Sequence, residues 1–132
     1  MRTRFIIETR GPGLYEFTRE VTRWTSGLGD GLVTLFARHT SCSLLIQENA
    51  DPDVRVDLAR FLARLAPENE PWITHAAEGP DDMPAHIKAA LLPVSLGIPV
   101  EAGRPLLGTW QGIYLWEHRR APHRREVAAH FA

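Results

Sequence analysis

Apolar and polar residues alternate along several short segments of the chain, and this period of two is typical of β-strands. The segment 32–37 is rich in β-branched and aromatic residues. The segment 112–119 alternates clearly, with Tyr114 on one face and Leu115 on the other. Strands are predicted at residues 4–9, 14–17, 32–37, 43–47, 96–100, 112–119 and 124–131.

Helical spacing of apolar residues predicts three helices between these strands. Asp51 and Pro52 open the longest as N-cap and first helical residue. Its apolar stripe comprises Val54, Leu58, Phe61, Leu62 and Leu65. Thr18 is the predicted N-cap of a helix over residues 19–26, and Asp82 is that of a short helix that ends at residues 90–92.

Strands with interspersed, non-alternating helices indicate an α+β fold with a mainly antiparallel sheet. A length of 132 residues suits one compact domain, residues 1–132, with two to three helices. The hydrophobic content of 44% is enough for a stable core. Breaks are expected at the glycine-rich segment 27–31 and at the turn 103–105.

Composition excludes several classes of protein. A net charge of −1 gives no reason to expect nucleic acid or membrane partners. One cysteine excludes an internal disulfide. The N-terminus becomes charged too early for a signal peptide, and no apolar run is long enough to span a membrane. We expect a soluble cytoplasmic protein.

The segment 75–88 is the richest in ionisable groups. It contains His75, Glu78, Asp81, Asp82, His86 and Lys88. It is either a solvated loop or a group of metal ligands and acid–base residues around a small polar ligand. We favour the second interpretation because another polar cluster, His39 to Ser43, offers complementary chemistry.

His39, His75 and His86 come from three different segments, as metal ligands often do. The spacing matches no known ligand signature, so unrelated surface histidines are the alternative. A divalent ion such as zinc or magnesium is the expected cofactor, and Asp82, Glu78 or Glu48 could supply oxygen ligands. Asp82 stands four residues before His86 and could orient that imidazole.

Other candidates are less specific. Cys42 is either a nucleophile with His39 as its base or a small buried residue. Glu117 and Arg119 share the face of Leu115, so they are either buried ionic groups or part of a frayed strand end. The glycine-rich segment 103–112 could hold phosphate, and the basic segment 118–125 is more typical of a solvated turn than of a nucleic-acid contact.

Together these segments resemble the YjbQ-like family, whose members are often labelled secondary thiamine-phosphate synthases. The matching pieces follow one another over nearly the whole chain. They are His39-Thr-Ser-Cys-Ser43, Glu48-Asn49-Ala-Asp51-Pro52, His75-x-x-Glu78-Gly79-x-Asp81-Asp82-Met-Pro-x-His86-Ile-Lys88, Ile98-Pro-x-x-x-Gly103-Arg104-x-x-Leu-Gly108-Thr-Trp-Gln-Gly112-Ile and Glu117-His118-Arg119.

The resemblance implies a homotrimer with a polar pocket near the subunit boundaries. It also implies a transferase that joins a hydroxymethylpyrimidine diphosphate to a thiazole phosphate, as a main or a side activity. Cationic side chains and a metal ion would stabilise the negative charge on the departing pyrophosphate. An indole side chain could stack on a heteroaromatic ring of the substrate.

The predicted site is assigned as follows. The catalytic residues are His39, Asp82, His86 and Glu117, and the metal ligands are His39, His75 and His86. The substrate-binding residues are Ser41, Glu48, Asn49, Lys88, Arg104, Thr109, Trp110 and Arg119. The same residues would suit two alternatives, a metal-dependent hydrolase of a small phosphorylated metabolite and a non-catalytic metabolite-binding module.

Overall fold

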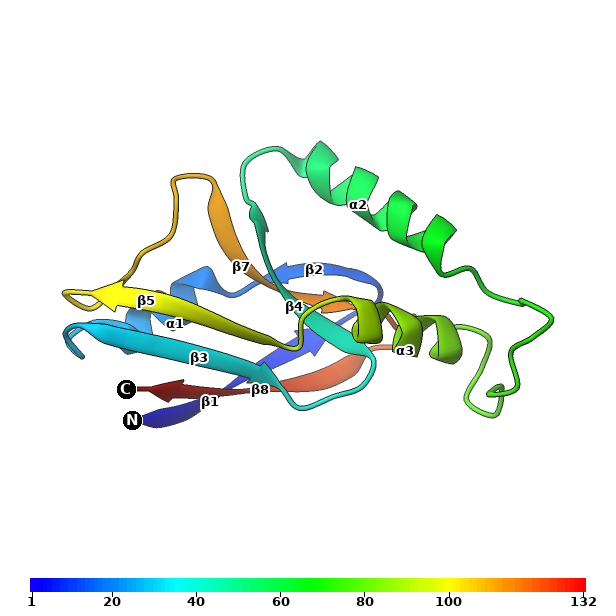
Figure 1. The fold of residues 1–132 in the computed structure, drawn as a ribbon, viewed down its shortest axis with the longest axis horizontal. Coiled ribbons are helices and arrows are strands. Elements are labelled where there is room, and N and C mark those ends of the chain that lie inside the picture. The colour runs from blue at the N-terminus through cyan, green and yellow to red at the C-terminus, as the bar shows by residue number, and fades with distance from the viewer.

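The computed structural model describes residues 1–132, which form two antiparallel sheets and three helices (Figure 1). The larger sheet has the order β1 (Arg2–Thr9), β8 (His123–Phe131), β3 (Gly31–Ala37), β5 (Ser95–Glu101) and β6 (Arg104–Pro105). The smaller sheet has the order β2 (Gly13–Glu16), β7 (Gln111–Glu117) and β4 (Cys42–Glu48). The helices are α1 (Thr18–Thr25), α2 (Pro52–Leu65) and α3 (Asp82–Leu91). The predicted α+β fold is confirmed.

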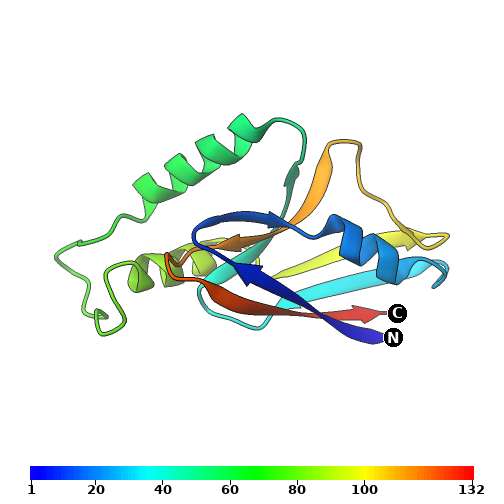
Figure 2. The ribbon, with the colours of Figure 1, turned by 180° about the vertical axis from the view of Figure 1, so that it is seen from behind.

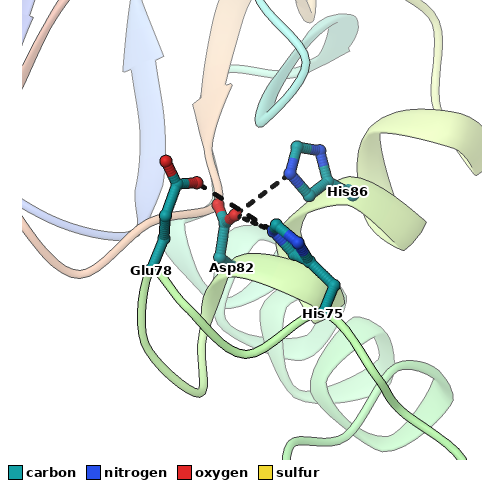
Figure 3. Close-up of side chains that lie close together, drawn as sticks. All are labelled: His75, Glu78, Asp82 and His86. Atoms are coloured by element: carbon teal, nitrogen blue, oxygen red, sulfur yellow. Dashed lines mark hydrogen bonds and ion pairs between the residues drawn. The ribbon is translucent and has the colours of Figure 1, made fainter.

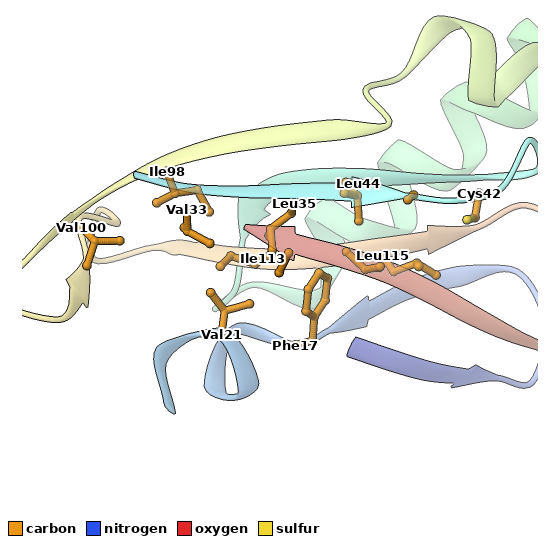
Figure 4. Packing of buried hydrophobic residues seen from close by; sticks show 13 residues of the cluster. Phe17, Val21, Val33, Leu35, Cys42, Leu44, Ile98, Val100, Ile113 and Leu115 are labelled. Carbon is orange, nitrogen blue, oxygen red and sulfur yellow. The ribbon is translucent and has the colours of Figure 1, made fainter. Parts of the chain in front are cut away.

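The hydrophobic core lies between the two sheets, and α1 packs against it (Figure 4). Strand β3 points Val33 and Leu35 into the core, as its alternating pattern requires. Leu44 and Leu115 face them from the smaller sheet. The chain ends lie side by side because β1 pairs with β8 along its whole length (Figure 2).

Two of the three predicted helix caps are wrong. Asp51 caps α2 as expected, since its carboxylate accepts a hydrogen bond from the Asp53 N–H. Thr18 instead is the first residue of α1, and its hydroxyl accepts a bond from the Ile113 N–H, which ties α1 to β7. Asp82 likewise lies inside α3, one residue after the N-cap position. The Asp82 carboxylate forms stronger, charge-assisted interactions with other side chains, so it does not cap the helix.

Helix α2 is only lightly attached to the rest of the molecule. Leu62 is its one buried residue, whereas Phe61 and Leu65 of the predicted apolar stripe are 64% and 55% exposed. Figure 1 shows α2 apart from the sheets, followed by the loop 66–81 that leads back to α3. That loop carries two of the candidate site residues. No helix of the structure combines the length and the apolar character that crossing a membrane would need.

Candidate functional site

Four ionisable side chains converge where the loop 66–81 joins α3 (Figure 3). They are His75, Glu78, Asp82 and His86, and one ligand atom of each lies within 4.8 Å of the others. The loop can turn back here because Gly79 adopts φ 103°, a conformation that favours glycine. Helical geometry then places Asp82 and His86 on one face of α3.

One carboxylate oxygen is the centre of this group. Asp82 Oδ2 lies 2.6 Å from His75 Nε2 and 3.1 Å from His86 Nε2. Glu78 Oε2 stands 3.9 Å from the same His75 nitrogen. Two imidazole nitrogens therefore face one oxygen of a side chain that is only 1% exposed.

The hydrogen bond made by Nδ1 of His86 determines whether its Nε2 can act as a ligand. His86 Nδ1 lies 3.0 Å from the Thr40 carbonyl oxygen, and only an N–H can donate to that acceptor. In the neutral imidazole, Nε2 then carries a lone pair that faces the Asp82 carboxylate. Two acceptors at 3.1 Å need a cation or a proton between them. A backbone bond of this kind is also how proteins orient metal-binding histidines.

Arg119 holds the other side of the Asp82 carboxylate. Its Nη1 lies 2.7 Å from Asp82 Oδ1, and its Nε donates to Asp81 at 2.9 Å. Burial alone would raise the pKa of Asp82, but the hydrogen bond with His75 and the charges of His86 and Arg119 outweigh it and lower the pKa to about 2. The carboxylate is thus ionised and fixed in orientation, as a metal ligand must be.

The structure places His39 outside this cluster. Its Nε2 accepts a hydrogen bond of 2.8 Å from the Glu126 N–H, so in the neutral ring Nδ1 carries the proton and no lone pair is free. Burial and the nearby Arg125 charge lower the pKa of His39, which favours that neutral form. Of the three predicted histidine ligands, two come together, and Asp82 and Glu78 join them in place of the third.

A groove of about 610 Å³ adjoins the cluster. His86 forms part of its wall together with Ala89 and Ala90 of α3. The remainder is lined by the end of β3, the following segment 38–40 and Val94. This volume lies in the usual range for small-molecule sites. The lining combines apolar residues with polar groups such as Arg38, His39 and His86.

Glu117, predicted to be catalytic, lies inside the protein. It is 0% exposed and accepts hydrogen bonds from Thr9 at 2.7 Å and from Arg125 Nε at 2.8 Å. Ser41, predicted to bind substrate, joins the same network, because its hydroxyl accepts from Arg125 at 2.9 Å. Glu117 also accepts from the Arg119 N–H, so it positions the chain segment that carries Arg119.

Cys42 does not have the environment of a nucleophile. The residue is 0% exposed, and burial raises the pKa of its thiol to about 11. His39, the proposed base, directs its acceptor nitrogen to Glu126 instead. The alternative interpretation, a small buried residue of the core, agrees with the structure.

The other predicted substrate-binding residues lie elsewhere in the single chain. Strand β4 pairs with β7 from Cys42 at the cluster end to Glu48 at the far end, ~20 Å away at the usual strand rise. Asn49 donates its backbone N–H to the Trp110 carbonyl there. The residues outside the cluster are Glu48 at the last paired position of β4, Asn49, Thr109 and Trp110 just beyond the paired ends of β4 and β7, Arg104 on β6 and Lys88 on a different face of α3.

Comparison with known proteins identifies relatives over the whole fold. The family model of the UPF0047 protein YjbQ-like family matches residues 3–132. The UPF0047 protein sll1880 of Synechocystis is 54% identical over 127 residues, which cover 95% of this chain and 86% of that protein. The UPF0047 protein YjbQ of Salmonella typhimurium is 47% identical over 120 residues, or 89% and 86% of the two chains.

Solved structures agree with these matches. The crystal structure of the conserved hypothetical protein TT1486 from Thermus thermophilus superposes with a TM-score of 0.89 at 41% identity, covering 98% of this chain and 99% of that one. A YjbQ/UPF0047 protein from Clostridium acetobutylicum gives 0.88 at 34% identity, with 98% and 99% coverage. The resemblance found in the sequence motifs is therefore confirmed, and the chain belongs to the YjbQ-like UPF0047 family.

Proposed function

We propose that this protein binds a divalent metal ion through His75, Asp82 and His86, with Glu78 as a further oxygen ligand, and acts on a small phosphorylated metabolite beside it. The observation that carries the proposal is the arrangement around Asp82 Oδ2, which two imidazole nitrogens approach at 2.6 and 3.1 Å. The lone pair of His86 Nε2 needs a proton or a cation at this point, and a metal ion would satisfy both acceptors.

The donor set suits such an ion. Two imidazoles and one carboxylate are a ligand set that catalytic zinc sites use, so His75, Asp82 and His86 would leave one position of a tetrahedral ion open for water or substrate. Glu78 would bind as a fourth protein ligand only by filling that position or by raising the coordination number. Ligand atoms of a tetrahedral ion with ~2.1 Å bonds lie roughly 3.4 Å apart. The four donor atoms here, all within 4.8 Å of one another, are compatible with that spacing after small side-chain adjustments.

A bound divalent ion would supply Lewis acidity toward a phosphoryl oxygen or a water molecule. The chain's own contribution is to orient the ligands and to hold the substrate. Thr40 fixes the ring of His86, Arg119 fixes Asp82, and the groove of about 610 Å³ lies against His86. Arg38 in the wall of that groove could contact an anionic substrate, but it already pairs with Glu126 at 3.1 Å and would have to share its charge.

Hydrolysis of one small substrate has more support within a single chain than the two-substrate transfer. Joining a pyrimidine diphosphate to a thiazole phosphate needs cations for both phosphorylated partners. Arg104 and Lys88 both lie outside the cluster, and Arg119 already pairs with two aspartates. The transfer would need residues from a second subunit.

We also propose that the chain forms a homotrimer. Several large apolar side chains are exposed on one chain, which is unusual for a surface that faces only water. They include Phe36, Phe61, Leu65, Trp72, Leu91 and Trp110, each at least 49% exposed. A second copy packed with its Trp110 end against the cluster of the first would complete a pocket for two substrates.

The metal proposal is tested by elemental analysis of untagged protein purified without added metal or chelator. We expect near-stoichiometric metal in the wild type and its loss in His86→Ala. His130→Ala is the matched control, because His130 is exposed on β8 and remote from the cluster. Equal metal content in His86→Ala, or no uptake of zinc, manganese or magnesium by the wild type, would refute the assignment.

The type of chemistry is tested separately with the metal-loaded protein. A hydrolase releases orthophosphate from a single phosphate monoester, whereas the transferase releases pyrophosphate only when both substrates are present. Each activity should fall together with metal content in His86→Ala. Saturable substrate binding without release of either product would instead indicate that the protein is a metal-dependent binding module and not an enzyme.

A further inference from the structure

A second pocket, of about 260 Å³, lies between α2, α3 and the end of β7. Its wall includes Asp81, the N-cap of α3, and the helical residues Pro84 and Lys88, which share one face at intervals of three and four residues. Asp82 and His86 belong to another face of the same helix. The pocket is therefore separate from the proposed metal site.

Every charged side chain in the wall of this pocket except Lys88 has a partner of opposite charge. Asp81 pairs with Arg119, and Glu68 pairs with Arg120. Glu117 pairs with the buried Arg125.

His118, also in the wall, adds no charge. Burial, and then the neighbouring Lys88 charge, lower its pKa to about 3. The half-buried Lys88 ammonium makes none of the hydrogen bonds or ion pairs that hold its neighbours. The carboxylates of Glu68 and Asp81 attract Lys88 from the same wall, but each forms its ion pair with an arginine instead. An anion in direct contact would therefore give the partly desolvated Lys88 the ion pair that it lacks.

Apolar and aromatic surface completes the pocket. Trp116 is 5% exposed and lines it beside His118, with a distance of 5.7 Å between the two ring centroids. Leu62, the one buried residue of α2, and Pro84 provide further apolar contact. A volume of about 260 Å³ is just below the usual range for ligand sites and limits the ligand to a small metabolite.

We infer that this pocket binds a small organic anion, a carboxylate or a phosphate ester with an apolar body. The anionic group pairs with Lys88, and the body rests on Trp116 between Leu62 and Pro84. Such a ligand would contact α2 and α3 together and so fasten the lightly packed α2 to the domain.

The test uses phenyl phosphate and benzoate as probes, with the neutral benzamide as their isostere. Binding is followed by two-dimensional NMR through the indole N–H signal of Trp116. We expect a saturable shift with at least one anion at millimolar concentration and none with benzamide. Response to phenyl phosphate alone or to benzoate alone identifies the anionic group that the pocket accepts, and either result supports the inference.

Variants assign the binding to this pocket. Lys88→Met keeps the apolar stem and should weaken the anion by about tenfold, the usual value of a bond to a charged group. Arg64→Met removes an exposed cation of α2 outside the pocket and should leave the affinity unchanged.

Three results would overturn the inference: no saturable shift with either anion, equal affinity in Lys88→Met, or loss of anion binding in His86→Ala. The last result would place the anion at the metal cluster. Retained anion binding in His86→Ala, together with metal loss, would show that the two sites are independent. Slower amide exchange in α2 on ligand addition is a second expected readout.

Discussion

Glu117 and Asp82 are both buried carboxylates, at 0% and 1% exposure, and their neighbours give them different roles. Glu117 is surrounded by fixed donors, including the Arg125 guanidinium and the Thr9 hydroxyl. Asp82 instead shares one oxygen between two imidazole nitrogens, His75 Nε2 and His86 Nε2, and a metal ion could bind between these three atoms. We therefore assign Glu117 to stability and Asp82 to the site.

Replacing Glu117 by Gln should destabilise the protein by about 3–5 kcal/mol, because Arg125 then remains buried without a counter-charge. Urea unfolding at neutral pH measures this change. Glu101→Gln, an exposed carboxylate on β5, is the control and should have little effect. Equal stability of the two variants would show that the buried pair contributes nothing.

The same carboxylate makes stability depend on pH. Burial alone would raise the pKa of Glu117, but the bonds from Arg125, Thr9 and the Arg119 N–H lower it below its usual value of 4.5. A lowered pKa means that the stabilisation is complete above the unfolded-state pKa and is lost as pH falls through the folded-state pKa. The difference in unfolding free energy between wild type and Glu117→Gln should therefore shrink below pH 4.5. A constant difference down to the acid limit would contradict this.

Cys42 should be inert in the folded protein. Its thiol pKa of about 11 and its complete burial leave almost no reactive thiolate at neutral pH. Ellman's reagent should detect no thiol in native protein and one thiol per chain in denaturant. Rapid labelling of the native state would restore Cys42 as a candidate nucleophile.

At the scale of elements, α2 is the part of the molecule with the least tertiary support. Its N-terminus is stabilised locally by the Asp51 cap and by Pro52, and only Leu62 is buried along its length. Strand β7, between β2 and β4, is bonded on both edges. Local opening should thus be easier in α2 than in β7.

Asp51→Ala should cost α2 about 1 kcal/mol and so accelerate its amide exchange about fivefold, without changing exchange in β7. Hydrogen exchange resolved by residue measures both elements in one experiment. Asp57→Ala, an exposed change in the middle of α2, should not accelerate exchange. Uniform acceleration across β7 would mean that α2 and the sheets open as one unit.

At the scale of the whole molecule, the exposed apolar side chains argue for assembly. Sedimentation should give a particle of about three times the 14.8 kDa chain mass. Burial of residues such as Phe61 and Trp72 between subunits is the expected driving force. A monomer at all concentrations would contradict the trimer and would leave the cluster and its groove as a complete site within one chain.

Local patterns in the sequence located the main strands and helices of this fold, but they misplaced two helix caps and predicted only a turn where β6 lies. Alternation located the long strands, and the Asp51-Pro52 pair located the start of α2, because both depend on neighbours only a few residues away. The same local geometry placed Asp82 and His86 on one helix face. The sequence alone therefore determined the fold class and the proximity of Asp82 and His86 within the cluster.

Only the tertiary structure decided which distant residues meet. His75 reaches Asp82 because the loop 66–81 folds back at Gly79, and His39 is withdrawn because β8 presents the Glu126 N–H to it. Arg104 lies apart because β6 ends the larger sheet. These outcomes depend on strand pairing and loop paths over many residues, which the spacing of residue types does not encode.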